Sequence, residues 1–238
     1  YLFKKILKII SRNSNKIFVQ NSYDHDILNE FTTKNKITLL NGSGLDTNFF
    51  YDCTLINTKD KIHQIVKDVR KVINKDLENI DAIIHLAALS NDPLGEFQKE
   101  ITNIVNYSST IRLAKMAKEM GVKRFVYAST QSLYGISKSD SELEEDTSEK
   151  NPITSYAESK WKSELELKRL ASDDFIITFF RPSTVFGPSP RLRCDIVFNS
   201  FVASAFTTGS IEILSDGTPW RPVVHIDDVC SAFIAGLI

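Results

Sequence analysis

The stretch IDAIIHLAAL at residues 80–89 is a continuous apolar run of strand length, and it decides the fold class. Such a run is typical of a strand buried on both faces, as in a parallel sheet covered by helices. RFVYAS at 124–129 and FIITFFR at 175–181 repeat the pattern, and helical patterns lie between them at about 98–120 and 154–171. This alternation predicts a right-handed, doubly wound α/β sheet.

Towards the N-terminus the same alternation continues with weaker signals. KIFVQ at 16–20 and KITLLN at 36–41 predict two more strands. Beyond the third buried strand, the pattern breaks into short segments punctuated by Pro and Gly. We therefore predict two domains, a parallel-sheet domain over residues 1–181 and a small substrate-binding lobe over residues 182–238.

The composition disfavours several classes of protein. The 29 Lys and Arg nearly balance the 30 Asp and Glu, whereas a nucleic-acid binder normally carries a basic excess. Cys53, Cys194 and Cys230 are isolated, so neither a Cys-x-x-Cys metal site nor a disulfide framework is indicated, and a cytoplasmic setting is favoured. The apolar runs are far shorter than the roughly 20 residues that span a bilayer. We expect no metal, no nucleic acid and no membrane as partners.

Open α/β sheets bind their ligands beyond the carboxyl ends of the strands. Polar residues of this chain fall at those positions: Ser90 follows the first buried strand, Ser129 and Thr130 the second, and Arg181 the third. Each is a candidate for a ligand site, although a Ser or Thr at a strand end can equally cap the helix that follows. Placement alone leaves both interpretations open.

Tyr156 and Lys160 lie four residues apart in a predicted helix, so their side chains share one face. A phenol has a pKa of about 10, and a neighbouring ammonium lowers that pKa, which makes the phenol usable as an acid and a base near neutral pH. The alternative is a half-buried Tyr beside a solvated Lys, which the spacing alone favours.

The order of motifs along the chain favours the acid–base interpretation of Tyr156 and Lys160. The motifs are HLAA at 85–88, Asn106, ASTQSLYG at 128–135, YAESK at 156–160, RPSTVFGP at 181–188 and DGTPWRPVVHIDDV at 216–229. In this order they resemble the extended short-chain dehydrogenase/reductase family, and best its nucleotide-sugar epimerase and dehydratase branch. The resemblance covers about two-thirds of the chain, from Asp81 to Ile238. It implies a Rossmann-like fold with NAD as cofactor, while NADP stays open.

The resemblance also implies roles for individual residues. Tyr156 corresponds to the proton donor and acceptor at a sugar hydroxyl, Lys160 holds the nicotinamide ribose, and Thr130 hydrogen-bonds the same substrate oxygen. Arg221 corresponds to an arginine that grips a nucleotide-sugar diphosphate, a task that suits a guanidinium. The expected cofactor contacts are Asn21, Ala87, Ala88, Asn106, Lys160, Arg181, Pro182 and Ser183, and the expected substrate contacts are Ser90, Gln131 and Arg221.

The chain also departs from the family pattern. The Gly-rich phosphate-binding loop that follows the first strand of the family has no counterpart here, and the C-terminus stops in the helix predicted to include VVHIDDV. We therefore expect a chain truncated at both ends. Asn21 stands where an acidic residue usually holds the adenosine ribose, and Ser43 stands where an Asp commonly contacts adenine.

The leading functional hypothesis is an NAD(P)-dependent nucleotide-sugar epimerase that uses the Thr-Tyr-Lys trio. A keto-sugar reductase is the alternative, because it uses the same trio. Dehydration is disfavoured, since 4,6-dehydratases carry an Asp-Glu pair where this chain has Gln131 and Ser132. A non-catalytic, dinucleotide-binding member of the same fold is a third hypothesis, and the resemblance is compatible with a homodimer.

Overall fold

The computed structural model describes the backbone of residues 17–19 and 37–39, and then residues 65, 67–90, 92–136, 142–189, 192–213, 215–216 and 222–237. The chain divides into two compact units. The first comprises Tyr1–Lys67 with Pro188–Asp195, and the second comprises Asp68–Gly187 with Ile196–Ile238. The predicted domain boundary between residues 181 and 182 stays a prediction.

The first unit contains the two N-terminal strands that the sequence predicts. β1 spans Ile17–Val19 and β2 spans Ile37–Leu39, and the two pair in parallel with Phe18 opposite Thr38. Parallel pairing of consecutive strands requires a crossover connection, as expected for the βαβ pattern.

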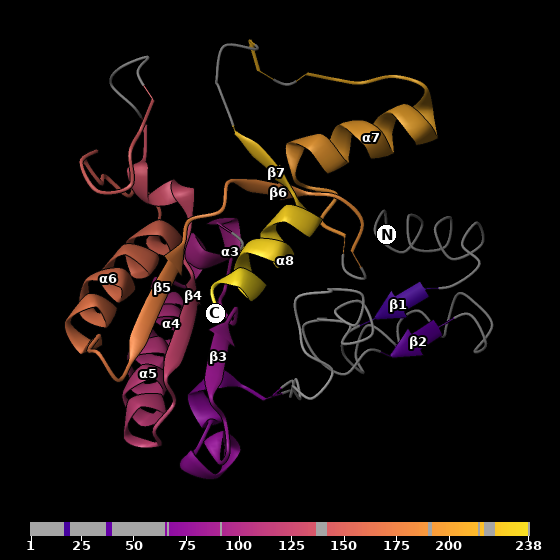
Figure 1. The fold of residues 1–238 in the computed structure, drawn as a ribbon. Helices are drawn as coiled ribbons and strands as arrows, with labels where there is room; N and C mark the ends of the chain where they lie inside the picture. Colours follow the sequence, from indigo (N-terminus) through magenta and orange to yellow (C-terminus); the bar gives the residue numbers. More distant parts are fainter. Residues whose placement is uncertain are drawn as a thin grey trace. The chain divides into compact units, whose positions relative to one another are not determined.

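The second unit is built on a three-stranded parallel sheet of order β3–β4–β5 (Figure 1). Its strands are β3 (Ala82–His85), β4 (Arg124–Ala128) and β5 (Ile176–Phe180). The register places Ile84 opposite Val126, and Val126 opposite Thr178. All three strands lie inside the apolar runs that predicted them, and the parallel α/β fold class is confirmed.

Helices α5 (Ser109–Glu119) and α6 (Ser155–Leu170) follow β3 and β4 in the chain. Alternate residues of β4 point to one face of the sheet and form a core with residues of both helices. The fully buried members of this core include Phe125, Tyr127, Leu167 and Phe175. This core fixes α6 against the sheet, and α6 carries Tyr156 and Lys160.

The single helix predicted over about 98–120 is divided in the structure. α4 (Lys99–Asn103) leads into a π-helical turn, η5 (Ile104–Ser108), and α5 continues to Glu119. A π-turn inserts an extra residue into the helical repeat, and such turns occur often at functional sites. The short helices in this unit are η3 (Val69–Lys71), η4 (Asn74–Leu77), α3 (Asp92–Phe97) and η6 (Gln131–Tyr134).

The C-terminal part of this unit contains a second parallel pair, β6 (Thr184–Phe186) with β7 (Val223–His225), and two helices, α7 (Val197–Thr208) and α8 (Ile226–Ala235). α8 packs on the sheet, because the Phe180 and Phe233 rings lie 5.0 Å apart. A Cβ at Gly236 would approach the Phe180 ring to 2.8 Å, so this close contact requires a glycine. His225 caps α8, since its Nδ1 accepts from the Asp227 backbone N–H.

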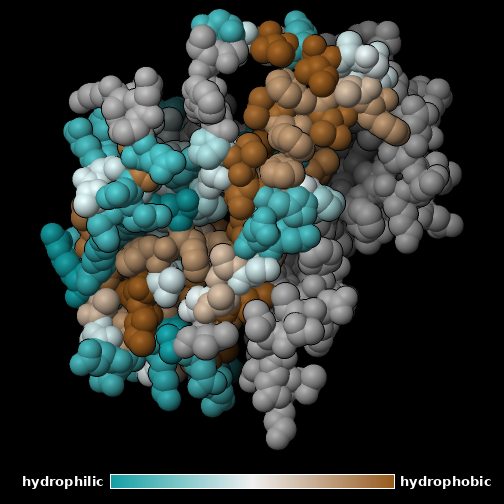
Figure 2. Space-filling model, turned by 45° about the horizontal axis from the view of Figure 1, so that its top comes forward, coloured by the Kyte–Doolittle hydropathy of each residue, from teal (hydrophilic) through white to brown (hydrophobic). Residues whose placement is uncertain are grey.

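Helix α7 carries no buried residue. Its exposed apolar side chains include Val202 and Phe206, which is 90% exposed. Figure 2 shows apolar surface gathered over this helix. On its other side, α7 contacts the β6–β7 pair, where the Phe198 ring lies 4.3 Å from that of Phe186.

Candidate active site

Lys160 is the centre of the candidate site. Its side chain is almost fully buried, and its ammonium donates a 2.7 Å hydrogen bond to the carbonyl of Ala128, the last residue of β4. Thr130 follows two residues later, at the carboxyl end of the strand. The same bond therefore holds the helix that carries Tyr156 against the strand end that carries Thr130.

Burial determines the charge of this ammonium. Desolvation lowers the pKa of Lys160 to about 7, while the charge of Glu164 acts in the opposite direction. The ammonium lies 4.7 Å from the centre of the Tyr127 ring and 5.9 Å from that of Tyr156. The site therefore places a lysine that can change charge near neutral pH beside the Tyr156 phenol ring.

Thr130 is oriented by the short helix that it begins. Its hydroxyl accepts from the Ser132 backbone N–H and donates to the Ser132 Oγ, both at 3.2 Å, so it is the N-cap of η6. The turn closes at Gly135, which has a φ of 69°. A Cβ there would lie 2.1 Å from the Asn151 carbonyl oxygen, so only glycine fits. The helix-capping interpretation of Thr130 is thus correct, and it leaves the hydroxyl at the strand end.

Asn106 lies in the π-turn η5 and binds the segment after β3. Its Oδ1 accepts from the Leu89 N–H at 2.7 Å, and its Nδ2 donates to the Leu89 carbonyl at 3.0 Å and to Ser159 Oγ at 3.1 Å. The side chain is fully buried. It therefore fixes the 86–90 segment next to α6, and this segment contains the predicted cofactor residues Ala87 and Ala88.

A buried polar chain lies beneath Asn106. The Thr110 hydroxyl donates to the Asn106 carbonyl at 2.7 Å, so the His85 Nε2, 2.8 Å away, must be the donor to Thr110. Desolvation, with a smaller contribution from the positive charge of Lys160, lowers the pKa of His85 to about 3. His85 is therefore a neutral donor inside the fold.

Arg181 makes contacts that the sequence reasoning missed. Its Nε and Nη2 donate to the two carboxylate oxygens of Glu164, and its Nη1 donates to the Tyr134 hydroxyl and the Glu145 carbonyl. Four of its five N–H groups are thus used within the protein. A signal for Glu164 was present, because it lies one helical turn after Lys160 on the same face.

The other predicted site residues are placed as follows. The Gln131 backbone N–H donates to the Pro182 carbonyl at 3.2 Å, so the η6 turn and the segment after β5 lie side by side. Ala87 and Ser90 are exposed after β3, whereas Ala88 and Ser183 are half-buried. The predicted positions Asn21, Ser43 and Arg221 lie outside the described residues.

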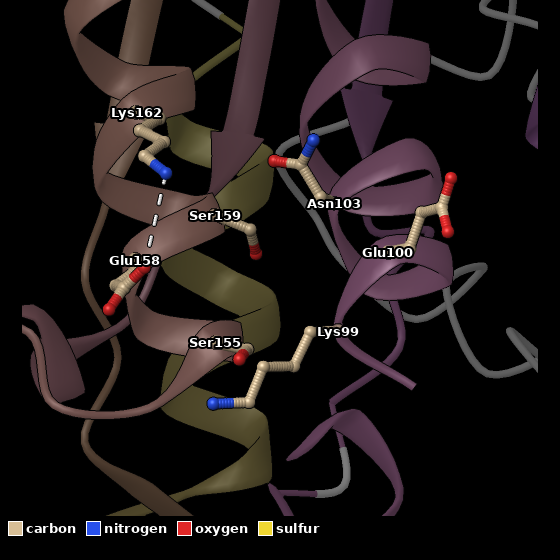
Figure 3. Close-up of a pocket in the computed structure, with 7 residues that line it drawn as sticks. All are labelled: Lys99, Glu100, Asn103, Ser155, Glu158, Ser159 and Lys162. Carbon is tan, nitrogen blue, oxygen red and sulfur yellow. Dashed lines mark ion pairs between the residues drawn. The ribbon is translucent and has the colours of Figure 1, made fainter. Parts of the chain in front are cut away.

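An open groove of about 280 Å³ lies between α4 and α6 (Figure 3). It is lined by Lys99, Glu100, Asn103, Ser155, Glu158, Ser159 and Lys162. Glu158 and Lys162 form an exposed ion pair at 3.9 Å, and Lys99 pairs with Glu96 at 2.8 Å. None of the predicted catalytic trio lines the groove. We interpret it as a solvated groove with charges of both signs.

In the part of the chain that the structure describes, no three His, Cys, Asp or Glu side chains are grouped to hold a metal ion. No helix of that part has the length and apolar character needed to cross a membrane.

The fold and the arrangement at its strand ends define a Rossmann-like protein of the short-chain dehydrogenase/reductase type. The chain belongs to the NAD dependent epimerase/dehydratase family, which it matches over residues 20–237. This confirms the resemblance that the sequence motifs indicate.

Among curated proteins, the chain is similar to UDP-glucuronate 4-epimerase of Thermodesulfobacterium geofontis, with 32% identity over 67% of this chain and 48% of that protein. It is also 30% identical to a dTDP-4-dehydro-6-deoxy-D-allose reductase of a Streptomyces species, over 69% of this chain and 53% of that protein. The chain thus spans about half the length of these relatives.

Among solved structures, the chain is similar to MoeE5 in complex with UDP-glucose and NAD. The TM-score is 0.62 at 30% identity, over 73% of this chain and 57% of that chain. This neighbour is a complex with NAD, and the family that the chain matches is NAD-dependent.

Proposed function

We propose that the protein is an NAD-dependent nucleotide-sugar epimerase in which Thr130, Tyr156 and Lys160 form the catalytic trio. The observation that carries the proposal is the Lys160–Ala128 hydrogen bond, which joins the Tyr156 helix to the strand end before Thr130. Family membership and the nucleotide-sugar enzymes among the relatives support the substrate class.

The described residues fit the nicotinamide-ribose end of NAD. Lys160 has three N–H donors and makes one hydrogen bond to described residues, so donors are left for ribose hydroxyls. The buried hydroxyl of Ser129 has no hydrogen-bond partner among the described residues, as expected where a polar group binds. Ala87 and Ala88 are small and leave room beside the strand end. When bound, NAD supplies a hydride acceptor and donor.

The chain's own residues would then control the proton. Tyr156 takes the proton of a sugar hydroxyl when the attached carbon loses its hydride, and returns that proton when the hydride comes back to the other face of the sugar. The Lys160 ammonium stabilises the phenolate by its charge. The Thr130 hydroxyl hydrogen-bonds the same sugar oxygen and holds it against Tyr156.

A keto-sugar reductase is the second candidate, and the similarity to the Streptomyces reductase favours it. The two reactions differ in redox balance, because an epimerase returns the hydride and a reductase consumes NADH. Dehydration is disfavoured, because Gln131 and Ser132 follow Thr130. Neither an amide nor an ordinary hydroxyl replaces the carboxylates that remove and donate protons in an elimination.

The test is a substrate panel with the full-length protein. UDP-, GDP-, CDP- and dTDP-sugars are incubated with catalytic NAD, and epimers are detected by NMR. 4-Keto sugars are incubated with NADH, and its oxidation is followed by absorbance. An epimer without net NADH formation supports the proposal, and NADH-dependent reduction alone favours the second candidate. A protein that neither binds nor converts any of the sugar nucleotides would refute both.

A further inference from the structure

A buried ion pair lies one helical turn beyond Lys160. The Glu164 side chain is completely buried, and that of Arg181 is 11% exposed. The contact is bidentate, with Nε to Oε1 at 3.0 Å and Nη2 to Oε2 at 2.7 Å. Hydrogen bonding to Glu164 raises the pKa of Arg181 above its usual value, so the guanidinium stays charged. A two-point contact of this kind fixes the plane of the guanidinium relative to α6.

The other edge of the same guanidinium binds two more segments. Nη1 donates to the Tyr134 hydroxyl at 2.8 Å and to the Glu145 carbonyl at 2.7 Å. Tyr134 is the last residue of η6, the turn that begins directly after Thr130. One side chain at the end of β5 thus joins the turn that Thr130 caps, the 142–150 segment and the catalytic helix.

The pair also places a negative charge near Lys160. Among the described residues, the rings of Tyr127 from β4 and Tyr156 from α6 lie 4.7 and 5.9 Å from the Lys160 ammonium. His85 from β3 and Glu164 from α6 interact with this ammonium through charge. His85 is neutral, because desolvation lowers its pKa to about 3, and burial raises the pKa of Tyr127 above its usual range. Glu164 is the member of this set that favours the charged form of Lys160.

We propose that the Glu164–Arg181 pair is a positioning device for the trio: Arg181 holds the η6 turn against α6, and Glu164 sets a carboxylate one helical turn beyond Lys160. The inference rests on the proposed function, in which Lys160 acts as a cation beside Tyr156. It assigns Arg181 a task inside the protein, in addition to the cofactor contact that the sequence predicts.

The first test measures the charge of Lys160 directly. Full-length protein labelled with ¹³C at lysine Cε is titrated by NMR, and K160M assigns the resonance. In E164Q the midpoint of the Lys160 titration should fall by about one pH unit or more, because an opposite charge is removed and the Arg181 charge is left unpaired. E164D, which keeps the carboxylate, should restore most of the midpoint.

The matched control for this titration is E166Q. Glu166 lies on the same helix and pairs with Arg169 at the surface, so its loss should leave the Lys160 midpoint unchanged. An unchanged midpoint in folded E164Q, or an equal shift in E166Q, would overturn the electrostatic part. Because this measurement needs neither NAD nor sugar, a shifted midpoint in a protein that turns over no sugar nucleotide would support the pair while the proposed function fails.

The second test uses Y134F, which keeps the buried ion pair and removes one hydrogen bond to Arg181. Loosening the η6 turn should lower kcat about twofold to tenfold, from the net value of one typical intramolecular hydrogen bond, with KM and the melting temperature little changed. A Y134F enzyme with wild-type kcat would overturn the positioning part. This test with Y134F can overturn the proposal even if E164Q does not fold.

Discussion

The ammonium of Lys160 and the carbonyl of Ala128 are joined by a 2.7 Å hydrogen bond between a helix and the end of a strand. Lys160 belongs to α6 and Ala128 to β4, and these two elements pack together through the core that contains Phe125 and Leu167. Burying an amino group that can carry a charge is costly, and this cost favours the functional role proposed for Lys160.

Replacing Tyr156 with Phe should lower the turnover of a sugar nucleotide about 100-fold or more, because general acid–base catalysis contributes factors of this size. NAD affinity should hold within about twofold, because the phenol hydroxyl handles the proton rather than the cofactor. Steady-state kinetics and a cofactor titration of the full-length protein measure both. If the variant kept more than about a tenth of the wild-type rate, the acid–base role would belong to another group.

Burial of Lys160 predicts a pH dependence of stability. Its pKa is about 7 in the folded protein and about 10.5 when exposed, so the unfolded chain binds more protons between these values. Lys160 therefore contributes a free energy of unfolding that rises with pH from about 7 to 10, by at most about 1.4 kcal/mol per pH unit. Urea denaturation should show this slope in the wild type and not in K160M. K162M, at an exposed position of the same helix, should keep this slope. The prediction would be contradicted if the unfolding free energies of the wild type and K160M changed with pH in the same way.

Burial of His85 predicts a second pH dependence of stability, on the acid side of neutral pH. Its pKa is about 3 in the folded protein against 6.5 when exposed, so the unfolded chain takes up the proton first as the pH falls. The contribution of His85 to stability is complete above about pH 6.5 and is lost between about pH 6.5 and 3, again by at most about 1.4 kcal/mol per pH unit. The difference in unfolding free energy between the wild type and H85Q should fall across this range. A constant difference would show that His85 is already charged or exposed.

The strands of the sheet could be predicted from the sequence because each is a short apolar run, which is typical of a parallel sheet. In the structure β4 is buried at its centre, whereas β3 and β5 are mostly half-buried. The residue at which the first of these strands ends could not be predicted. In the LAAL part of IDAIIHLAAL, Leu89 gives its N–H and C=O to the Asn106 side chain instead of a neighbouring strand. β3 has already ended at His85, so the apolar run is longer than the strand that it forms. The π-turn that aims Asn106 at this segment also has no apolar signature, since it changes the helical repeat by a single residue.

For the candidate site, too, the sequence predicts some contacts and not others. Tyr156 and Lys160 could be placed together because helical geometry alone puts residues four apart on one face. The contact of Lys160 with Ala128 depends on how α6 packs on the sheet, which the local sequence does not contain. Spacing places Glu164 on the same helix face as Lys160, but it does not indicate that Arg181, which follows β5, is the partner of Glu164.

Asn106 should prove more important for the fold than its neighbours on the helix. N106A removes a buried side chain and leaves the N–H and C=O of the half-buried Leu89 without their partners, which should cost about 2–4 kcal/mol of unfolding free energy. It should also weaken NAD binding, because the 86–90 segment is no longer held. N103A, which removes an exposed side chain one turn earlier, is the matched control. Denaturation and cofactor titration would contradict the prediction if the two variants behaved alike.

Arg221 carries the prediction that tests the substrate class. It lies in the motif DGTPWRPVVHIDDV, outside the described residues, and the family resemblance assigns it to a nucleotide-sugar diphosphate. The alternative is a surface arginine paired with Asp216 or Asp228. A bidentate guanidinium–phosphate contact is charge-assisted, and its loss should cost about 1.5–3 kcal/mol.

In the full-length protein, R221A should therefore lower kcat/KM for the sugar nucleotide by about 10- to 150-fold, the same free energies expressed as rate factors. NAD affinity should barely change, because the residue serves the other ligand. R169A removes an arginine that pairs with Glu166 at the surface, and it should leave both values unaltered. Kinetics of R221A and R169A across UDP-, GDP-, CDP- and dTDP-sugars distinguish the two interpretations. Equal kcat/KM values for R221A and the wild type on every sugar would make Arg221 a surface residue and remove the residue-level argument for a diphosphate-linked substrate.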